Sequence, residues 1–406
     1  MTTHATVDRV SSAGDGAVVA ERLAIAFAEQ ACARDAARTL PHDQVQALKS
    51  SGLLALSVPT EHGGIEAPAT TVAEVFRLLA HADPSLAQIP HSHYTFLEAL
   101  RLQGTHAQQA RFYSLVCDGA LFANAQTERG PHAVNVDTTT LTVAAGGGYA
   151  LTGRKFYCTG ALFADWLIVR ASLADGSEDA PTSTTPKAIA FVPRDAPGLG
   201  IIDDWDGMGQ RTTASGTVVL DDIWVPADHV VPFSPIFDQP TVYGAHAQLL
   251  HAAIDVGIAT GALAEGVRQA AKARPHFEAH VDSAVNDTTL IQTAGELTVT
   301  VRGAQALLVH AASQLDAARA DLTEDSAAAT SVAVAVAKVA AARAALDASS
   351  LLFELGGTRS ATAGDNLSRY WRDARTHTLH DATRWKLQHI GRHTLSGTRP
   401  PRHGQV

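Results

Sequence analysis

The chain has 406 residues, of which 46% are hydrophobic and 18% charged, so it is long enough for two or three domains with buried cores. Its formal net charge of −10 argues against nucleic-acid binding, which needs a concentrated basic surface. We expect no membrane span, because Lys338 and Arg343 interrupt the most apolar stretch, residues 331–346. We also expect no secretory signal in the first 16 residues, which lack a basic stretch followed by an apolar one. Three cysteines without metal-ligand spacing predict reduced thiols in a cytoplasmic protein.

Residues 1–118 are predicted to form a helical domain. Apolar residues recur there at spacings of three and four, as in amphipathic helices, over residues 17–37, 70–87 and 93–104. A proline suited to a first helical turn opens a further helical segment at residues 40–56.

Residues 119–233 are predicted to form a compact antiparallel β domain of barrel-like shape. The glycines at 146–148 separate two alternating segments, which indicates a hairpin. Short runs rich in β-branched residues follow at 165–173, 186–195 and 216–226. A polar loop at 174–186 interrupts them.

Residues 234–406 are predicted to form a C-terminal helical bundle. Three alanine-rich stretches are long enough for bundle helices: 244–273, 290–320 and 326–357. Gly356 and Gly357 are placed to end the third helix. A fourth, shorter helix would carry residues 375–385, which makes the fold class α+β with a four-helix bundle at the C-terminus.

The stretch RTHTLHDATRW, residues 375–385, carries a group of polar side chains that are able to do chemistry. On a helix, His377 and His380 would share one face, with Asp381 one turn from His377. The stretch is compatible with a metal site, with catalytic acid and base groups, or with an ordinary polar helix. A metal site would need a third ligand, and no His-Glu-x-x-His motif or cysteine pair accompanies the histidines, so none is expected.

Several motifs together resemble the acyl-CoA dehydrogenase fold over nearly the whole chain. The motifs are NAQTERG, GRKFYCTGALFADWLIVRA, MGQRTTASGTVVLDDIWVP, RPHF and ELGGTR, at residues 124–130, 153–171, 208–226, 274–277 and 354–359. Within that superfamily, residues 352–386 are most similar to the two-component flavin-dependent monooxygenases of the dibenzothiophene monooxygenase type.

This resemblance implies a homotetrameric monooxygenase that uses FMN as FMNH2 together with O2. A C4a-hydroperoxyflavin would pass one oxygen atom to a small organosulfur substrate, or to an amine or aromatic one. FAD is less expected than FMN. A separate NAD(P)H:flavin reductase is implied, because the sequence has no Gly-x-Gly-x-x-Gly loop between a strand and a helix. No nucleic-acid or membrane partner is expected.

The resemblance also assigns residues to the flavin and to the substrate. His380 would face the flavin, where an imidazole can donate and accept protons near neutral pH, and Asp381 would orient it. Thr159 would bond the flavin N5 edge, with Asn124 and Thr127 beside the ring. Other motif positions implicated in binding the cofactor are Arg274 (reached from a neighbouring subunit), Phe277, Gly356, Gly357 and Arg359, the arginines being suited to phosphate. Residues expected to line the active-site pocket are His91, His93, Tyr94 and Trp205.

Two other functions stay open from the sequence. Asp381 stands where the acyl-CoA dehydrogenases commonly have a catalytic glutamate, so the chain could be an FAD-dependent dehydrogenase or a nitroalkane-oxidase-like enzyme with Asp381 as base. Alternatively, it could be a helical assembly protein that kept the fold and lost catalysis. The individual residues also have ordinary explanations: strand propensity for Thr159, a surface ion pair for Arg274, and core packing for the aromatic residues.

Overall fold

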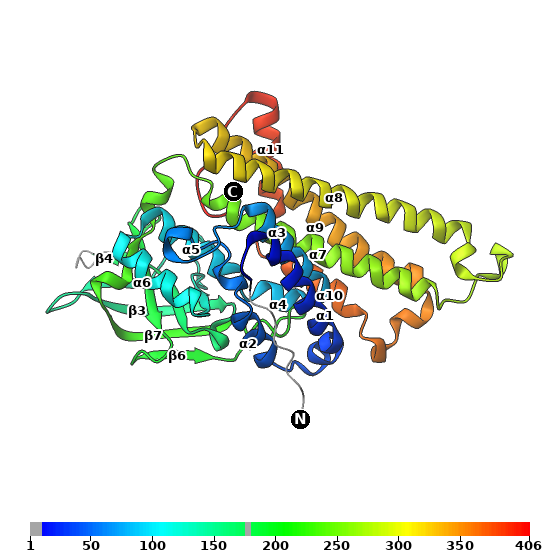
Figure 1. Ribbon diagram of the computed structural model, residues 1–406, viewed down its shortest axis with the longest axis horizontal. Coiled ribbons are helices and arrows are strands. Elements are labelled where there is room, and N and C mark those ends of the chain that lie inside the picture. The colour runs from blue at the N-terminus through cyan, green and yellow to red at the C-terminus, as the bar shows by residue number, and fades with distance from the viewer. Residues whose placement is uncertain (1–9, 175–179) are drawn as a thin grey trace.

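The computed structural model describes residues 10–174 and 180–406, which form helical, β and helical regions in chain order (Figure 1). The first nine residues, which include part of the stretch examined for a signal sequence, lie outside the described residues. So do positions 175–179 of the polar loop.

The N-terminal helices pack against both other regions. Capping residues fix where two of these helices begin. Thr105 and Gln108 form a capping box at the start of α6, and the Asp83 carboxylate caps α4 by accepting hydrogen bonds from the amides of Ser85 and Leu86. Helix α3 packs on α1 on one side and on the long helix α7 on the other. The six helices are α1 Ala13–Ala37, α2 His42–Ser50, α3 Ala69–Ala82, α4 Pro84–Gln88, α5 His91–Gln103 and α6 His106–Cys117.

The middle region is an eight-stranded sheet with the order β6-β7-β3-β2-β4-β5-β8, and β1 pairs with β4 off this path. The hairpin of β2 and β3 around the glycine turn is confirmed. The expectation of a purely antiparallel sheet is wrong at two places, because β4 pairs parallel with both β1 and β2. The strands are β1 Phe122–Ala125, β2 Thr140–Val143, β3 Tyr149–Cys158, β4 Trp166–Ala174, β5 Lys187–Pro193, β6 Leu199–Ile202, β7 Gly216–Val225 and β8 Val230–Pro232.

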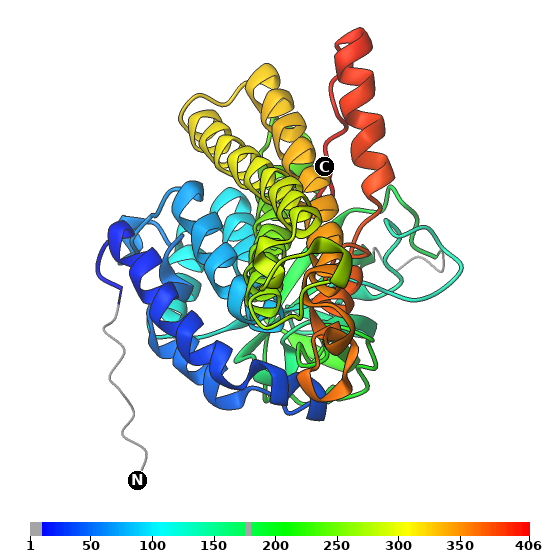
Figure 2. The same cartoon turned by 90° about the vertical axis from the view of Figure 1, so that its right-hand side faces the viewer.

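The C-terminal region is a bundle built around α7 and α9, with α11 projecting from it (Figure 2). As predicted, α9 ends at Gly356, and Gly357 takes a positive φ of 65° at its C-cap. The prediction of a single helix over 375–385 is wrong, because one helix ends at His377 and the next begins at Thr383. The helices are α7 Tyr243–Ala270, α8 Thr288–Ala320, α9 Glu324–Gly356, α10 Ser368–His377 and α11 Thr383–Ser396.

Two bundle helices correct the expectation that no stretch is long and apolar enough to cross a membrane. By length and composition both α7 and α9 pass that test, and the stretch 331–346 lies inside α9. Both helices pack closely against each other, and most of the apolar part of α7 is buried. Their apolar character is therefore explained by burial in the bundle, because a helix that is apolar on all sides is expected in a protein core.

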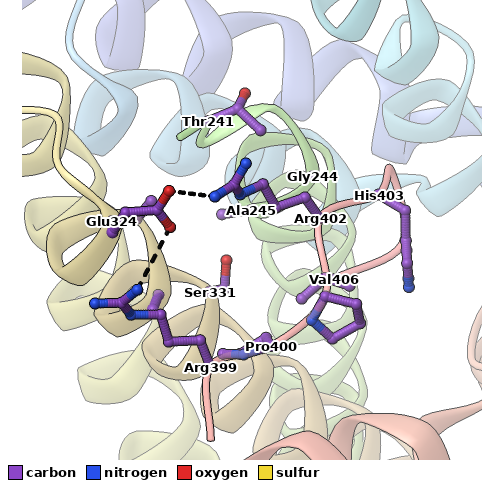
Figure 3. A pocket seen from close by; sticks show the side chains of 13 residues that line it. Thr241, Gly244, Ala245, Glu324, Ser331, Arg399, Pro400, Arg402, His403 and Val406 are labelled. Carbon is purple, nitrogen blue, oxygen red and sulfur yellow. Dashed lines mark hydrogen bonds and ion pairs between the residues drawn. The ribbon is translucent and has the colours of Figure 1, made fainter. Parts of the chain in front are cut away.

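The C-terminal tail closes the end of the bundle where α7 and α9 begin (Figure 3). Arg399 and Arg402 both form ion pairs with Glu324 at the start of α9. Val406 is buried, and a Cβ on Gly244 would lie 2.3 Å from the carbonyl oxygen of His403, so the tail lies directly on α7. The contact fixes the last residues of the chain against two bundle helices.

Close packing of α7 on α3 predicts the effect of a substitution at Gly257. An added Cβ would lie 2.5 Å from the Ala80 Cβ and 2.6 Å from the Arg77 carbonyl oxygen. We expect Gly257→Ala to destabilise the protein by about 1–3 kcal/mol through overpacking. Gly303→Ala on α8, where a Cβ meets nothing within 4 Å, should stabilise it by about 0.5–1 kcal/mol. Melting temperatures of the two variants should shift in opposite directions, and a rise for Gly257→Ala would contradict the packing.

Candidate active site

Three histidines from different parts of the chain stack on one another. His251 on α7 lies between the other two rings: its centroid is 3.7 Å from that of His91, the first residue of α5, and 4.0 Å from that of His380. The Nε2–H of His91 donates to the carbonyl oxygen of Ala247, 2.9 Å away, when the ring is neutral. The stack is therefore anchored to α7 at both His251 and His91.

Behind the stack lies a buried line of hydrogen bonds centred on Asp255. One carboxylate oxygen of Asp255 accepts from Nδ1 of His377, and the other lies 2.8 Å from Nζ of Lys338 on α9. Nε2 of His377 lies 3.1 Å from Nδ1 of His251, which completes the line. Asp255 and His377 are 0–1% exposed, and so is Lys338. A buried charge persists only when it is paired and hydrogen-bonded, and Asp255 meets both conditions.

The surroundings of the stack hold its imidazoles neutral. Burial, helped by neighbouring imidazoles, lowers the pKa of His91 to about 3. Burial likewise lowers the pKa of His380 to about 4, although the carboxylate of Asp381 acts in the opposite direction, and it lowers the pKa of His251 well below its usual range. Burial alone would raise the pKa of Asp255, but Lys338 and His377 outweigh it and lower that pKa. The site therefore contains neutral rings beside a charged carboxylate.

His380 and Asp381 occupy the break between α10 and α11. The side chain of His380 is exposed to solvent, although nearby protein atoms partly desolvate its ring. Asp381 forms an ion pair with Lys386 at 3.1 Å, with both side chains nearly buried. Nζ of Lys386 also donates to the carbonyl oxygen of Gln405 in the C-terminal tail. Helix α10 ends at His377, so the predicted shared helical face of His377 and His380 does not form.

A second group of candidate residues lies on the β domain. The hydroxyl of Thr159 lies 2.8 Å from that of Ser215, which lies 2.7 Å from the hydroxyl of Thr213. The side-chain amide of Asn124 donates to the carbonyl oxygen of Tyr157, whereas its Oδ1 is buried with no hydrogen-bond partner among the described residues. Thr127 pairs with Phe156 through the main chain, next to these groups. An unsatisfied acceptor and a row of hydroxyls suit a polar ligand.

A cavity of about 300 Å³ opens beside this row of hydroxyls. Trp205 lines it, with its indole N–H donating to the carbonyl oxygen of Gln210 and its ring edge facing Tyr157. Aromatic walls with a few polar groups are typical of small-ligand sites. The lining residues are Arg129, Tyr157, Asp204, Trp205, Asp206, Ser215, Gly216 and Thr217.

Helix α10 connects the two groups of candidate residues. The carboxylate of Asp373 accepts the amide N–H of Gln210, 2.6 Å away, in the segment that leads to Ser215. One helical turn further along α10, His377 belongs to the line behind the imidazole stack. Because residues four apart lie about 6 Å from each other on a helix, α10 brings the hydroxyl row and the imidazoles into one region.

The candidate cofactor residues in the bundle gather at one of its ends. The guanidinium of Arg359 donates to the carbonyl oxygen of Lys272, 2.9 Å away, which ties the glycine turn to the connection between α7 and α8. Arg274 lies in that connection, not at the start of a bundle helix, and is exposed, as is Phe277. A Cβ on Gly356 would meet the Ser360 hydroxyl at 2.0 Å, so the turn requires glycine for packing.

The structure places His93 and Tyr94, which were predicted to line the substrate pocket, in the protein core. Nε2 of His93 lies 2.9 Å from the Leu54 carbonyl oxygen, and its Nδ1 accepts the amide N–H of Phe122. The hydroxyl of Tyr94 donates to the carbonyl oxygen of Leu53, and its ring packs edge-on against Phe76. Their polar atoms are used for folding and leave none for a substrate.

Sequence reasoning missed three residues of this site. His251 and Asp255 stand four residues apart on an otherwise apolar helix, which places them on one face. Lys338 is a single charge within an apolar stretch, and we noted it only as an interruption. An isolated charge in a core helix indicates a buried partner, and that signal was available. Among the described residues, no three His, Cys, Asp or Glu side chains are grouped so as to hold a metal ion.

Comparisons with known proteins identify the family of this chain. Models of the N-terminal, middle and C-terminal domains of acyl-CoA dehydrogenases match residues 18–120, 122–223 and 249–385. The dibenzothiophene monooxygenase of Rhodococcus qingshengii is 33% identical over 97% of this chain and 96% of its own length. The chain belongs to the dibenzothiophene monooxygenase family.

Two further family members support this assignment. A probable FMNH2-dependent monooxygenase of Pseudomonas putida, SfnC, is 31% identical over 94% of this chain and 95% of its own. The crystal structure of FMN-bound TdsC from Paenibacillus sp. A11-2 superposes with a TM-score of 0.91 at 30% identity, covering 96% of this chain and all of TdsC. The predicted resemblance and fold class are thereby confirmed.

The neutral imidazoles predict how stability depends on pH. Their pKa values are lower in the folded protein than in the unfolded chain, so below the usual value of 6.5 the unfolded chain binds more protons. Stability should fall as the pH drops from 6.5, by up to about 1.4 kcal/mol per pH unit for each buried imidazole. Burial raises the pKa of Asp373 to about 7 and also raises the pKa of Asp83, and these two groups oppose the trend. Melting curves at pH 7.5 and 5.5 should show a lower transition at pH 5.5, and an equal or higher one would contradict the assignment.

Proposed function

We propose that the chain is an FMNH2-dependent monooxygenase that transfers one oxygen atom from O2 to a small organosulfur compound. The observation that carries the proposal is the accessible imidazole of His380, packed 4.0 Å from the ring of His251 in a region that α10 connects to the hydroxyl row of the β domain. Family relatives named as monooxygenases of dibenzothiophene, or as dependent on FMNH2, support it.

The reaction balances as sulfide plus O2 plus FMNH2 giving sulfoxide, FMN and water. Bound FMNH2 supplies the two electrons, and its two hydrogens end in the water molecule. A separate reductase that transfers hydride from NAD(P)H to FMN would regenerate FMNH2, as the relative named FMNH2-dependent indicates. The protein then has to bind the flavin, exclude water and place protons.

The residues on the β domain fit the ring of a flavin. Tyr157 and Trp205 offer aromatic surface in a cavity that also holds the Arg129 guanidinium. The buried Oδ1 of Asn124 and the hydroxyl of Thr159 would bond polar atoms at the ring edge. In this arrangement His380 would hold or donate a proton near the reacting oxygen, because a neutral imidazole can accept a proton and return it.

We further propose that the chain works as a cytoplasmic homotetramer. Large apolar side chains are exposed on α8, on α11 and in the connection between α7 and α8, and contiguous apolar surface marks protein interfaces. Arg274 lies beside exposed Phe277 in that connection, where it could reach the flavin phosphate of a neighbouring subunit. The exposed residues are Phe277, Ile291, Val299, Val309, Trp385, Leu387 and Leu395. In agreement with a reducing compartment, the described cysteines form no disulfide.

The dehydrogenase or oxidase alternative fits the site less well. Burial raises the pKa of Asp381, but Lys338 and Lys386 outweigh it, and the net pKa is lower than usual. A carboxylate held in an ion pair with Lys386 is a weak base for removing a proton from carbon. The family relatives named as monooxygenases likewise favour oxygenation over that chemistry.

The proposed function is tested with flavin-free protein, FMN, an unrelated NADH:flavin reductase and dibenzothiophene under ¹⁸O2. We expect a sulfoxide that carries one ¹⁸O atom. His380→Ala should lower product formation about a hundredfold and release H2O2 instead, because general acid–base catalysis is lost. His132→Ala, at an exposed histidine, is the matched control and should match the unmodified protein.

Two results would contradict the proposal. One is reduction of a bound flavin by an organic substrate in the absence of O2 and reductase, which would indicate an oxidase or dehydrogenase. The other is the absence of measurable binding of FMN, which would indicate a protein that kept the fold and lost catalysis.

A further inference from the structure

The line from Asp255 to His251 is more extensive than packing requires. It joins α7 to α10 through two imidazoles. Both ring nitrogens of His377 and the Nδ1 of His251 are hydrogen-bonded within it. In the described part of the chain, Nε2 of His251 forms no hydrogen bond, so the line has one open end. That end belongs to the ring against which His380 stacks.

The hydrogen-bond polarity of this line has two self-consistent states. In the first, neutral His377 donates from Nδ1 to Asp255 and accepts at Nε2 the Nδ1–H of His251, whose own Nε2 is then an acceptor. In the second, His377 carries a second proton at Nε2 and donates it to Nδ1 of His251, whose Nε2 must then carry the hydrogen. One proton therefore switches the open end between acceptor and donor.

We propose that Asp255, His377 and His251 form a proton relay that positions and protonates the imidazole stack next to His380. This proposal rests on the proposed function. A proton that reaches Nε2 of His251 displaces the Nδ1 proton onto Nε2 of His377, and the reverse shift returns it, so the relay neither gains nor loses a proton over a turnover. In the loaded state the added positive charge lies on His377, in contact with the Asp255 carboxylate. The three are positioning residues.

The charges around the relay favour reversible storage of a proton. Lys338 pairs with the second oxygen of Asp255, so that carboxylate is already neutralised by one permanent cation. The stacked partner His91 keeps its Nε2 bonded to the Ala247 carbonyl oxygen, which leaves only its Nδ1 to face other groups. The titratable and charged groups that surround the relay come from six segments: Asp255 and His251 on α7, Lys338 on α9, His377 on α10, His380 and Asp381 in the break, Lys386 on α11 and His91 on α5.

The first test uses flavin-free protein labelled with ¹⁵N-histidine. In the unmodified protein at pH 8, the ¹⁵N shifts of His251 should show its hydrogen on Nδ1, with its signals assigned by their loss in His251→Gln. His377→Phe keeps a ring in place but removes the acceptor, so the hydrogen of His251 should redistribute toward Nε2. An unchanged tautomer of His251 in His377→Phe would overturn the proposal.

The second test follows the share of H2O2 in total turnover against pH, with FMNH2 supplied by the reductase. In the unmodified protein this share should change with pH as the relay is loaded. The change with pH should disappear, and the H2O2 share rise severalfold, in His377→Phe and in Asp255→Asn/Lys338→Met, which removes both buried charges together. His246→Phe, at another buried histidine on α7, is the control and should keep the profile of the unmodified protein.

The two tests separate a relay from a structural role and from failure of the proposed function. Variants that fold but keep the profile of the unmodified protein would show that the line only supports the bundle, and would overturn the proposal. If the unmodified protein forms no oxygenated product, the proposed function fails, and the ¹⁵N shifts alone then decide whether His377 sets the tautomer of His251.

Discussion

The arrangement of the active site depends on one buried carboxylate. Asp255 sits inside the bundle between Lys338 and His377, and so fixes the mutual positions of α7, α9 and α10. Removing one partner of such a pair leaves an uncompensated charge and costs about 3–5 kcal/mol, so the three helices are held in one register. The same contact orients His377 toward His251 and thereby sets the ring against which His380 packs. The contacts of Asp255 therefore both stabilise the bundle and orient the imidazoles of the proposed site.

The site is also a junction between the β domain and the bundle. The Asp373 carboxylate accepts a hydrogen bond from the Gln210 amide of the β domain. One helical turn later, His377 contacts His251 in the proposed relay, so α10 carries both contacts. The break after α10 exposes His380, while Lys386 holds Asp381 on one side and the C-terminal tail on the other. The proposed binding of a flavin between the two regions would require both to be placed correctly, and the buried polar contacts around this short helix hold them together.

The order of helical, β and helical regions was predictable, because the spacing of apolar residues differs between helices and strands and because long alanine-rich runs indicate helices. The parallel pairing of β4 with β1 and β2 was not, since it depends on which strands meet in space. The break at residues 378–382 contains no glycine or proline that would have indicated it, and its Asp381 pairs with Lys386 of α11. His380 and Thr159 were predicted as site residues through the resemblance alone. Asp255, His251 and Lys338 were missed because Lys338 is 83 or more residues from the other two, and because all three lie within helices that have the pattern of ordinary core helices.

The central claim is that the hydroxyl row of the β domain and the imidazole stack of the bundle enclose one flavin. A crystal structure of the protein with FMN tests it most directly. We predict density for the ring in contact with Thr159 and the cavity wall at Trp205, with His380 directly facing it. Density for FMN at another place, or a ring that leaves His380 without contact, would contradict the account.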